Sequence, residues 1–380
     1  MEFLDYGTLR VIWWLLLGVL LIGFAVMDGS DLGAGILLPI VARTDSERRI
    51  VINTVGPVWE GNQVWLILGA GAIFAAWPPV YAIAFSGFYV AMFLVLCSLI
   101  LRPVGFKYRS KVTDARWRRT WDALLFVGGF VPPLVFGVAV GNALRGVPFR
   151  LDDTLRLTYE GGLVGLLNPF ALLAGLVSVA MVAMHGGAYL AAKAEEPVAG
   201  RARQAAFVAA LALILLFALA GVWTSSADGY RITGAIAHDG PSNPLGKTAE
   251  QAAGAWLANY RDMPWTMVAP ALAFAGALLA AILTRVARRD GLAWVASAVS
   301  VTGVVATAGV SMFPFILPSS LDPQSSLTVW DSSSSRTTLL VMLGATLIFV
   351  PLIIAYTAFV YRVLRGRVTA SQIDADHSSY

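Results

Sequence analysis

The stretch that decides the fold runs from Leu20 to Gly35 and reads LLIGFAVMDGSDLGAG, an apolar run that contains Asp28 and Asp31. An aspartate near the centre of a membrane-spanning helix costs roughly 2.5 to 3.5 kcal/mol on insertion scales, so an ionisable group at membrane depth marks a candidate ion or proton site. Two acids three residues apart project from nearly the same face of one helix. The stretch therefore predicts a membrane helix that does more than anchor the chain.

The composition around this stretch is that of an all-α polytopic membrane protein. Of the 380 residues, 58% are hydrophobic and 13% charged, and the apolar runs reach the ~20 residues that cross a bilayer. We expect about nine transmembrane helices, near residues 9–42, 61–78, 79–102, 120–144, 161–192, 203–224, 264–285, 291–317 and 337–362. The single cysteine, Cys97, excludes an internal disulfide and an iron–sulfur cluster held by this chain alone.

The orientation follows from the basic residues, because cytoplasmic loops retain an excess of Lys and Arg. The loops after the first, third, fifth and seventh segments, together with the C-terminal tail, hold nineteen of the 27 basic residues. We therefore expect the N-terminus outside and the C-terminus in the cytoplasm. The loop from Arg102 to Arg119 is the most basic and would attract anionic lipid head groups, although an ordinary solvated positive-inside loop explains it as well.

The order of the segments predicts two four-helix bundles plus one peripheral helix. The first bundle covers residues 1–144, the second residues 145–320 with an outward loop at 225–263, and residues 321–380 form the ninth helix and a cytoplasmic tail. A second outward segment, residues 313–336, contains prolines that prevent a continuous helix. In it, Asp331 and the four serines that follow are candidates to cap the ninth helix.

The predicted topology brings further polar groups to the level of the two aspartates. At 1.5 Å per residue, Asp28 lies about 27 Å along its helix from Arg10, on the cytoplasmic side of a core roughly 30 Å thick. Glu60, followed by Asn62 and Gln63, enters the membrane there, Arg102 ends the third segment, and Asp122 opens the fourth. Arg102 is the expected counter-charge, since a guanidinium offers a carboxylate two parallel hydrogen bonds.

This constellation supports two interpretations. Close carboxylates cannot all ionise comfortably, so at least one is expected to exchange a proton, which makes Asp28, Asp31, Glu60, Arg102 and Asp122 candidates for a proton entry route from the cytoplasm. The alternative is an ion-pair cluster that only holds the first four helices together.

Ligands for a metal or a haem are scarce. The three histidines are His185, His238 and His377, and only His185 is near membrane depth. No pair has metal-ligand spacing, and phosphate-binding glycine loops and hydrolase motifs are absent. We expect no metal site, no catalytic residue and no nucleic-acid partner for this chain.

Thirteen blocks in order along nearly the whole chain closely resemble subunit II of the bacterial cytochrome bd-type quinol oxidases. They are FAVMDGSDLGAG, ERRIVINTVGPVWEGNQVW, FAAWPPVYAIAFSGFYVAM, LRPVGFKYRSK, FVPPLVFGVAVGN, LLNPFALLAGLVSV, FALAGVW, DGYRI, SNPL, GAWL, MFPFILPSS, SLTVWDSSSS and HSSY. The polar membrane positions of that family fall on Asp28, Asp31, Glu60 and Arg102, with Asp122 at an acidic position. Close relatives commonly have Asp in place of Glu60.

The resemblance implies a subunit of a terminal oxidase in the bacterial inner membrane. Such a complex oxidises quinol, reduces dioxygen to water and builds a proton gradient without pumping. The two b-type haems and one d-type haem of the family are held by the partner subunit I, against which subunit II packs, usually with a small single-helix subunit. Some relatives also hold a structural quinone in subunit II.

Two readings from other classes remain. A secondary transporter would also carry midplane carboxylates and broken helices, but the halves of this sequence share no repeated motif. A purely structural scaffold for subunit I would account for the buried charges without any proton route.

Overall fold

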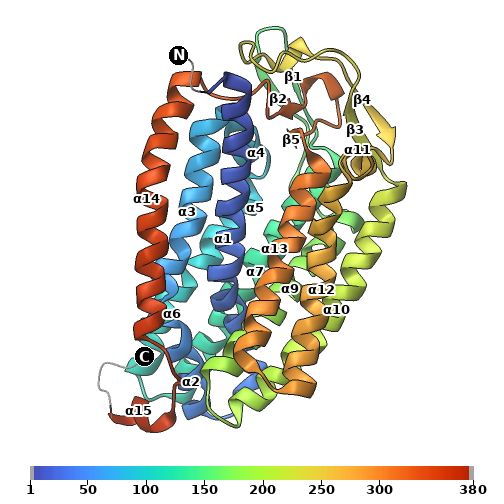
Figure 1. Cartoon of the computed structure of the whole chain (residues 1–380). Helices are drawn as coiled ribbons and strands as arrows, with labels where there is room; N and C mark the ends of the chain where they lie inside the picture. Colours follow the sequence, from blue (N-terminus) through green and yellow to red (C-terminus); the bar gives the residue numbers. More distant parts are fainter. Residues whose placement is uncertain (1–3, 376–380) are drawn as a thin grey trace.

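The computed structural model describes residues 4–375 and confirms an all-α membrane architecture (Figure 1). Eight helical stretches in this part are long and apolar enough to cross a membrane, and a bent helix pair makes a ninth. The spans are α1 (Tyr6–Val41), Tyr89–Lys111 with α5 (Tyr89–Leu99) and α6 (Leu101–Tyr108), α7 (Ala115–Arg145), α9 (Pro169–Lys193), α10 (Val198–Ser226), Pro264–Val286 with α12 (Val268–Ile282), α13 (Asp290–Met312) and α14 (Arg336–Val363).

The bent pair corrects one predicted boundary. The second predicted segment is α3 (Trp59–Ala76), but the third does not begin near residue 79, because α4 (Pro78–Gly87) turns by 119° from α3. Trp77 precedes Pro78, and the residue before a proline is pushed out of the α conformation; its φ and ψ are −134° and 70°. The returning span therefore starts at Tyr89.

Three small antiparallel sheets lie together at one end of the molecule, called here the strand end. They pair β1 (Phe149–Leu151) with β2 (Leu157–Tyr159), β3 (Asp228–Ile232) with β4 (Ala249–Ala253), and β5 (Phe315–Leu317) with β6 (Leu327–Thr328). The short helices α8 (Leu163–Leu166) and α11 (Ala258–Asp262) complete this end, while α2 (Asp45–Val55) and α15 (Ala370–Ala375) lie at the opposite one, the α15 end. Both segments predicted to face outward thus share one end.

Buried charged side chains stabilise the strand end through an ion pair and hydrogen bonds. Lys247 Nζ lies 2.9 Å from Asp331 Oδ2, and both side chains are almost fully buried. Arg10 of α1, also buried, donates through Nε to Ser333 Oγ at 2.7 Å. Asp331 therefore serves as a counter-charge and not as the cap of the ninth helix; Ser335 caps α14 by accepting from Thr338 N.

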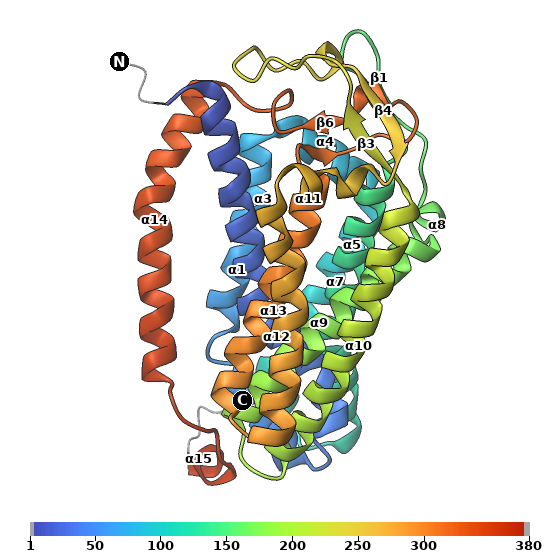
Figure 2. The ribbon, with the colours of Figure 1, turned by 45° about the vertical axis from the view of Figure 1, so that its right-hand side comes forward.

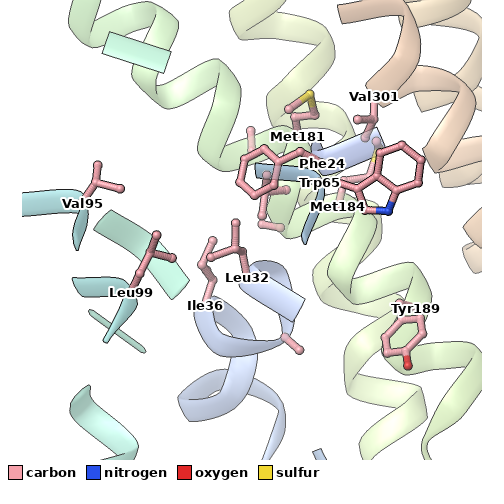
Figure 3. Packing of buried hydrophobic residues seen from close by; sticks show 14 of the residues in the cluster. Phe24, Leu32, Ile36, Trp65, Val95, Leu99, Met181, Met184, Tyr189 and Val301 are labelled. Atoms are coloured by element: carbon pink, nitrogen blue, oxygen red, sulfur yellow. The ribbon is translucent and has the colours of Figure 1, made fainter. Parts of the chain in front are cut away.

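Close helix contacts position α1 at the centre of the molecule. It packs against α3, α7, α9 and α13, and Figure 3 shows its Phe24, Leu32 and Ile36 within the buried core. At Gly33 the approach to α9 is closest, since a Cβ there would lie 2.2 Å from Val182 O and 2.8 Å from Gly186 Cα. The small residues beside the two aspartates are thus what lets neighbouring helices reach them.

Helix α14 lies at the edge of the molecule, where it contacts α1 and α3 (Figure 2). Because α1 packs against α9 and α13 as well as α3 and α7, helices of both predicted bundles meet along it. The division at residues 144 and 320 stays a prediction, as does the side of the membrane that each end faces. The first turn of α1 and the last turn of α14 lie at opposite ends.

Candidate functional site: a buried acid–arginine cluster

Asp28 of α1 and Arg102 of α6 form a two-pronged ion pair in the interior. Arg102 Nη1 donates to Asp28 Oδ2 at 2.9 Å and Nη2 donates to Oδ1 at 2.6 Å. Asp28 is 0% and Arg102 2% exposed. The aliphatic part of the Arg102 side chain passes over Gly128 of α7, where a Cβ would lie 3.0 Å from Arg102 Cγ. Such a pair is close to electrically neutral as a unit.

Asp31 lies beside this pair with a different set of partners. Its Oδ2 accepts a hydrogen bond from Asn62 Nδ2 at 2.9 Å and lies 3.9 Å from Arg102 Nη2. Its Oδ1 is buried and accepts no hydrogen bond from the residues that the structure describes. If both carboxyls were ionised, one guanidinium would face two negative charges, so a proton on Asp31 is what would neutralise the site.

The outermost helix also reaches this site. Asn62 Nδ2 donates to Tyr361 Oη at 3.1 Å, so that Tyr361 of α14 is linked to Asp31 through a single amide. We call Asp28, Asp31, Asn62, Arg102 and Tyr361 the acid–arginine cluster. It draws its members from α1, α3, α6 and α14 and joins residues up to 333 positions apart in the chain.

The structure places Asp122 in a second network, apart from this cluster. Asp122 Oδ1 accepts from Arg109 Nε at 2.5 Å and Oδ2 from Arg48 Nη1 at 2.9 Å. It precedes Gly128 by six residues, about 9 Å along α7, toward the α15 end. The sequence predicted one constellation, and the structure divides it into two.

Glu60 is not brought to either network. It is exposed in the first turn of α3, and the described residues give it no hydrogen bond or ion pair. Asn62, two residues later, is 1% exposed. Successive helical residues are rotated by about 100°, so residues two apart point to nearly opposite faces, and only the amide faces the aspartates.

The basic loops at the α15 end are held by ion pairs of their own. Arg201 Nη2 lies 2.7 Å from Glu47 Oε2, which also accepts from the backbone N–H of Arg43 at 2.6 Å. Burial alone would raise the pKa of Glu47, but these bonds outweigh it and hold that pKa below its usual value. Part of the positive charge near this end is therefore structural.

Sequence reasoning missed Tyr361 and the aromatic groups behind it. Trp294 of α13 stacks on Tyr361 with ring centroids 5.9 Å apart and donates through Nε1 to Ser30 Oγ at 3.2 Å. A tyrosine or tryptophan near the end of a membrane helix is usually an interfacial anchor, so neither residue carried a signal in the sequence.

The histidines do not fit a haem in this chain. Both ring nitrogens of His185 are engaged, Nδ1 with Ser297 Oγ at 2.7 Å and Nε2 with Val26 O at 2.8 Å. His238 stacks on Trp330 at the strand end, and His377 lies outside the described residues. Groups of three or more metal-ligating side chains are also absent from the described part of the chain.

The fold and the site together define a class: a multi-pass membrane protein with a buried acid–arginine ion pair between its helices. The family model for cytochrome bd terminal oxidase subunit II matches residues 9–364. Cytochrome bd-I ubiquinol oxidase subunit 2 of Escherichia coli K12 is 51% identical over 99% of this chain and 100% of its own length. Probable cytochrome oxidase subunit 2 of Haemophilus influenzae is 50% identical, with the same coverage.

More distant proteins share the fold. Cytochrome bd ubiquinol oxidase subunit 2 of Bacillus subtilis is 30% identical over 96% of this chain and 98% of its own length. A chain of the bd oxidase structure from Geobacillus thermodenitrificans superposes with a TM-score of 0.70 at 19% identity, covering 94% of this chain and 98% of that one. The chain belongs to the cytochrome bd terminal oxidase subunit II family and is a multi-pass protein of the bacterial inner membrane.

Proposed function

We propose that this chain is the subunit II of a complex that oxidises quinol and reduces dioxygen to water. Relatives covering its full length are named as ubiquinol oxidase subunits, which supports this role over that of a secondary transporter. In the proposed complex, two b-type haems and one d-type haem belong to the partner subunit I, in keeping with the engaged nitrogens of His185. A small single-helix subunit completes the complex, and a structural quinone in this chain stays a prediction.

The acid–arginine cluster is proposed to deliver protons from the cytoplasm to subunit I. The observation that carries this proposal is the asymmetry between the two acids. Both oxygens of Asp28 are bound by Arg102, whereas the buried Oδ1 of Asp31 has no hydrogen-bond partner among residues 4–375. Asp28 and Arg102 fix the charge, and Asp31 is then the group that takes up and releases the proton. Quinol protons leave on the outer side, so the complex builds a gradient without pumping.

The arrangement of donors suggests an order for the route. The phenol of Tyr361 meets Asn62, and Asn62 meets Asp31 Oδ2, which makes Tyr361 the outermost member on the side of α14. Glu60 is exposed two residues before Asn62 and is proposed to collect protons at the mouth. This assignment requires the α15 end to face the cytoplasm, as the excess of Lys and Arg there predicts.

A structural role is favoured for Asp122. Both of its oxygens are bound by arginines, from α2 and from the end of α6, so an ionised Asp122 is compensated as it stands. We propose that this second network joins α2, α6 and α7 and that Asp122 conducts no protons. The scaffold function of the subunit thus resides in residues different from those of the proton route.

The test compares Asp31→Asn with Asp122→Asn in the whole complex reconstituted in liposomes. Asp31→Asn should preserve the haem spectrum but lower quinol-driven oxygen uptake at least tenfold, together with proton uptake from the inside. Asp122→Asn should weaken assembly and leave the turnover per haem of the assembled fraction unchanged. Full turnover in both single variants, Asp31→Asn and Glu60→Gln, would contradict the proposed proton route.

A further inference from the structure

A cleft separates α14 from the helices beside it over the half of the molecule toward the α15 end. Its volume is about 740 Å³. The wall is formed by apolar side chains from α1, α3, α9, α13 and α14, among them Val19, Ile22, Val26, Trp294, Ile354 and Ala358. Protein interiors rarely leave voids larger than a water molecule, and water does not settle in apolar space. The cleft therefore fits an apolar occupant.

The length of the cleft matches one membrane leaflet. Its wall on α1 extends from Val19 to Met27, which is about 12 Å along a helix. Half of a hydrocarbon core roughly 30 Å thick is about 15 Å. An acyl chain that enters from the leaflet at the α15 end would therefore have most of its own length in contact with α14.

The chemistry changes where the cleft reaches the α15 end, because Lys193, Arg365 and Arg367 line it there. Lys193 Nζ donates to Leu364 O at 2.6 Å, a neutral carbonyl that leaves the charge of the ammonium uncompensated. Arg367 shares Asp290 with Arg203. Among the described residues, neither Lys193 nor Arg365 has an ion-pair partner, so this end of the cleft carries positive charge.

We propose that the cleft binds an anionic phospholipid, with its phosphate against Lys193, Arg365 and Arg367 and its acyl chains between α14 and α1. The cleft has an apolar wall about one leaflet long and three cationic side chains at one end. An anionic phospholipid is complementary to it, because its acyl chains are apolar and its phosphate carries a negative charge at one end. A neutral amphiphile would pack against the apolar wall but would form no ion pair with the three cationic side chains. The bound lipid would also support α14, whose contacts with the other helices are few, and so hold Tyr361 against Asn62.

The lipid site stands independently of the proton route, and its test measures binding. The purified complex is stripped of lipid in detergent and then exposed to equal amounts of phosphatidylglycerol and phosphatidylcholine, and the retained lipid is counted by native mass spectrometry. Phosphatidylglycerol should be retained in preference. A basic residue near a membrane surface contributes about 1 kcal/mol, so Arg365→Gln should weaken retention by about fivefold.

Two further variants separate the cleft from general surface charge. Arg362→Gln removes an exposed cation from the last turn of α14 that does not line the cleft, and it should leave retention unchanged. Ala358→Trp fills the cleft with the cations intact and should abolish retention, while the haem spectrum reports that the complex has assembled. The proposal would be overturned if the two lipids were retained equally, if no lipid were retained, or if a neutral isoprenoid occupied the cleft instead. Equal losses of retention in Arg362→Gln and Arg365→Gln would also overturn it.

Discussion

Replacing Asp28 by asparagine removes the negative charge that faces Arg102 without changing the shape of the side chain. Breaking a buried pair at one side costs about 3–5 kcal/mol, because the other charge is left uncompensated. Asp31 limits that cost: its Oδ2 lies 3.9 Å from Arg102 Nη2, and unit charges about 4 Å apart attract by ~4 kcal/mol at an effective dielectric constant of 20. We therefore expect Asp28→Asn to lower the free energy of unfolding by about 1 kcal/mol.

The same reasoning gives different costs for the other variants. Asp31→Asn leaves the pair of Asp28 and Arg102 intact and changes one hydrogen bond, worth about 1 kcal/mol. The double variant removes both carboxylates and leaves Arg102 buried with no counter-charge, at the full cost of about 3–5 kcal/mol. It should therefore be less stable than the sum of the single variants by about 2 kcal/mol, within the range of coupling seen between residues in contact.

The assay is denaturant unfolding of the purified complex in mixed micelles, followed by the loss of haem absorbance. Adding Arg102→Gln to the double variant removes the stranded charge and should recover most of the lost stability. Both single variants should lose turnover, because in Asp28→Asn the remaining aspartate becomes the fixed counter-charge of Arg102. Simple additivity of the two single variants, or no recovery on adding Arg102→Gln, would refute the assignment of Asp31 as the reserve counter-charge.

Three further predictions address other parts of the molecule. Gly33→Ala should prevent assembly of the haem-containing complex, since its Cβ would meet a carbonyl oxygen of α9, whereas Gly18→Ala, in open space on the same helix, should leave the haem content unchanged. Lys247→Met should cost about 3–5 kcal/mol in the same unfolding assay, and the double variant with Asp331→Leu should restore most of it. Tyr361→Phe should slow turnover severalfold with the KM for quinol unchanged; unaltered turnover would remove this residue from the route.

Much of the architecture was predictable because the bilayer imposes it. Spans of about twenty apolar residues give the number of helices directly, and the prolines of residues 313–336 exclude a helix there. The boundary near residue 79 was wrong because hydropathy stays high through Pro78 and Pro79, while the direction of the backbone changes there. Hydropathy reports the depth of a residue and carries no information about its direction.

The expected contacts are found where residues are close in sequence or opposite in charge, while the role of the site stays a prediction. Asp28 and Asp31 share a helix face by spacing, and Arg102 was their expected counter-charge, which the two hydrogen bonds to Asp28 confirm. The prediction placed Asp122 with them because depth was the only coordinate available. Asp122 lies about 9 Å nearer the α15 end than Gly128, against which Arg102 packs, and there its carboxylate faces the arginines of another network.

The sequence by itself determined that this chain spans the membrane about nine times, that it carries acids at membrane depth, and which family it resembles. These properties depend on composition, spacing and the order of motifs, all of which are local along the chain. Only the tertiary structure decided that Asn62 meets both Asp31 and Tyr361, because packing brings α14 to α3 although Asn62 and Tyr361 are 299 positions apart in the sequence. The rotation of each helix about its axis is fixed by its neighbours, and that rotation selects which polar groups meet.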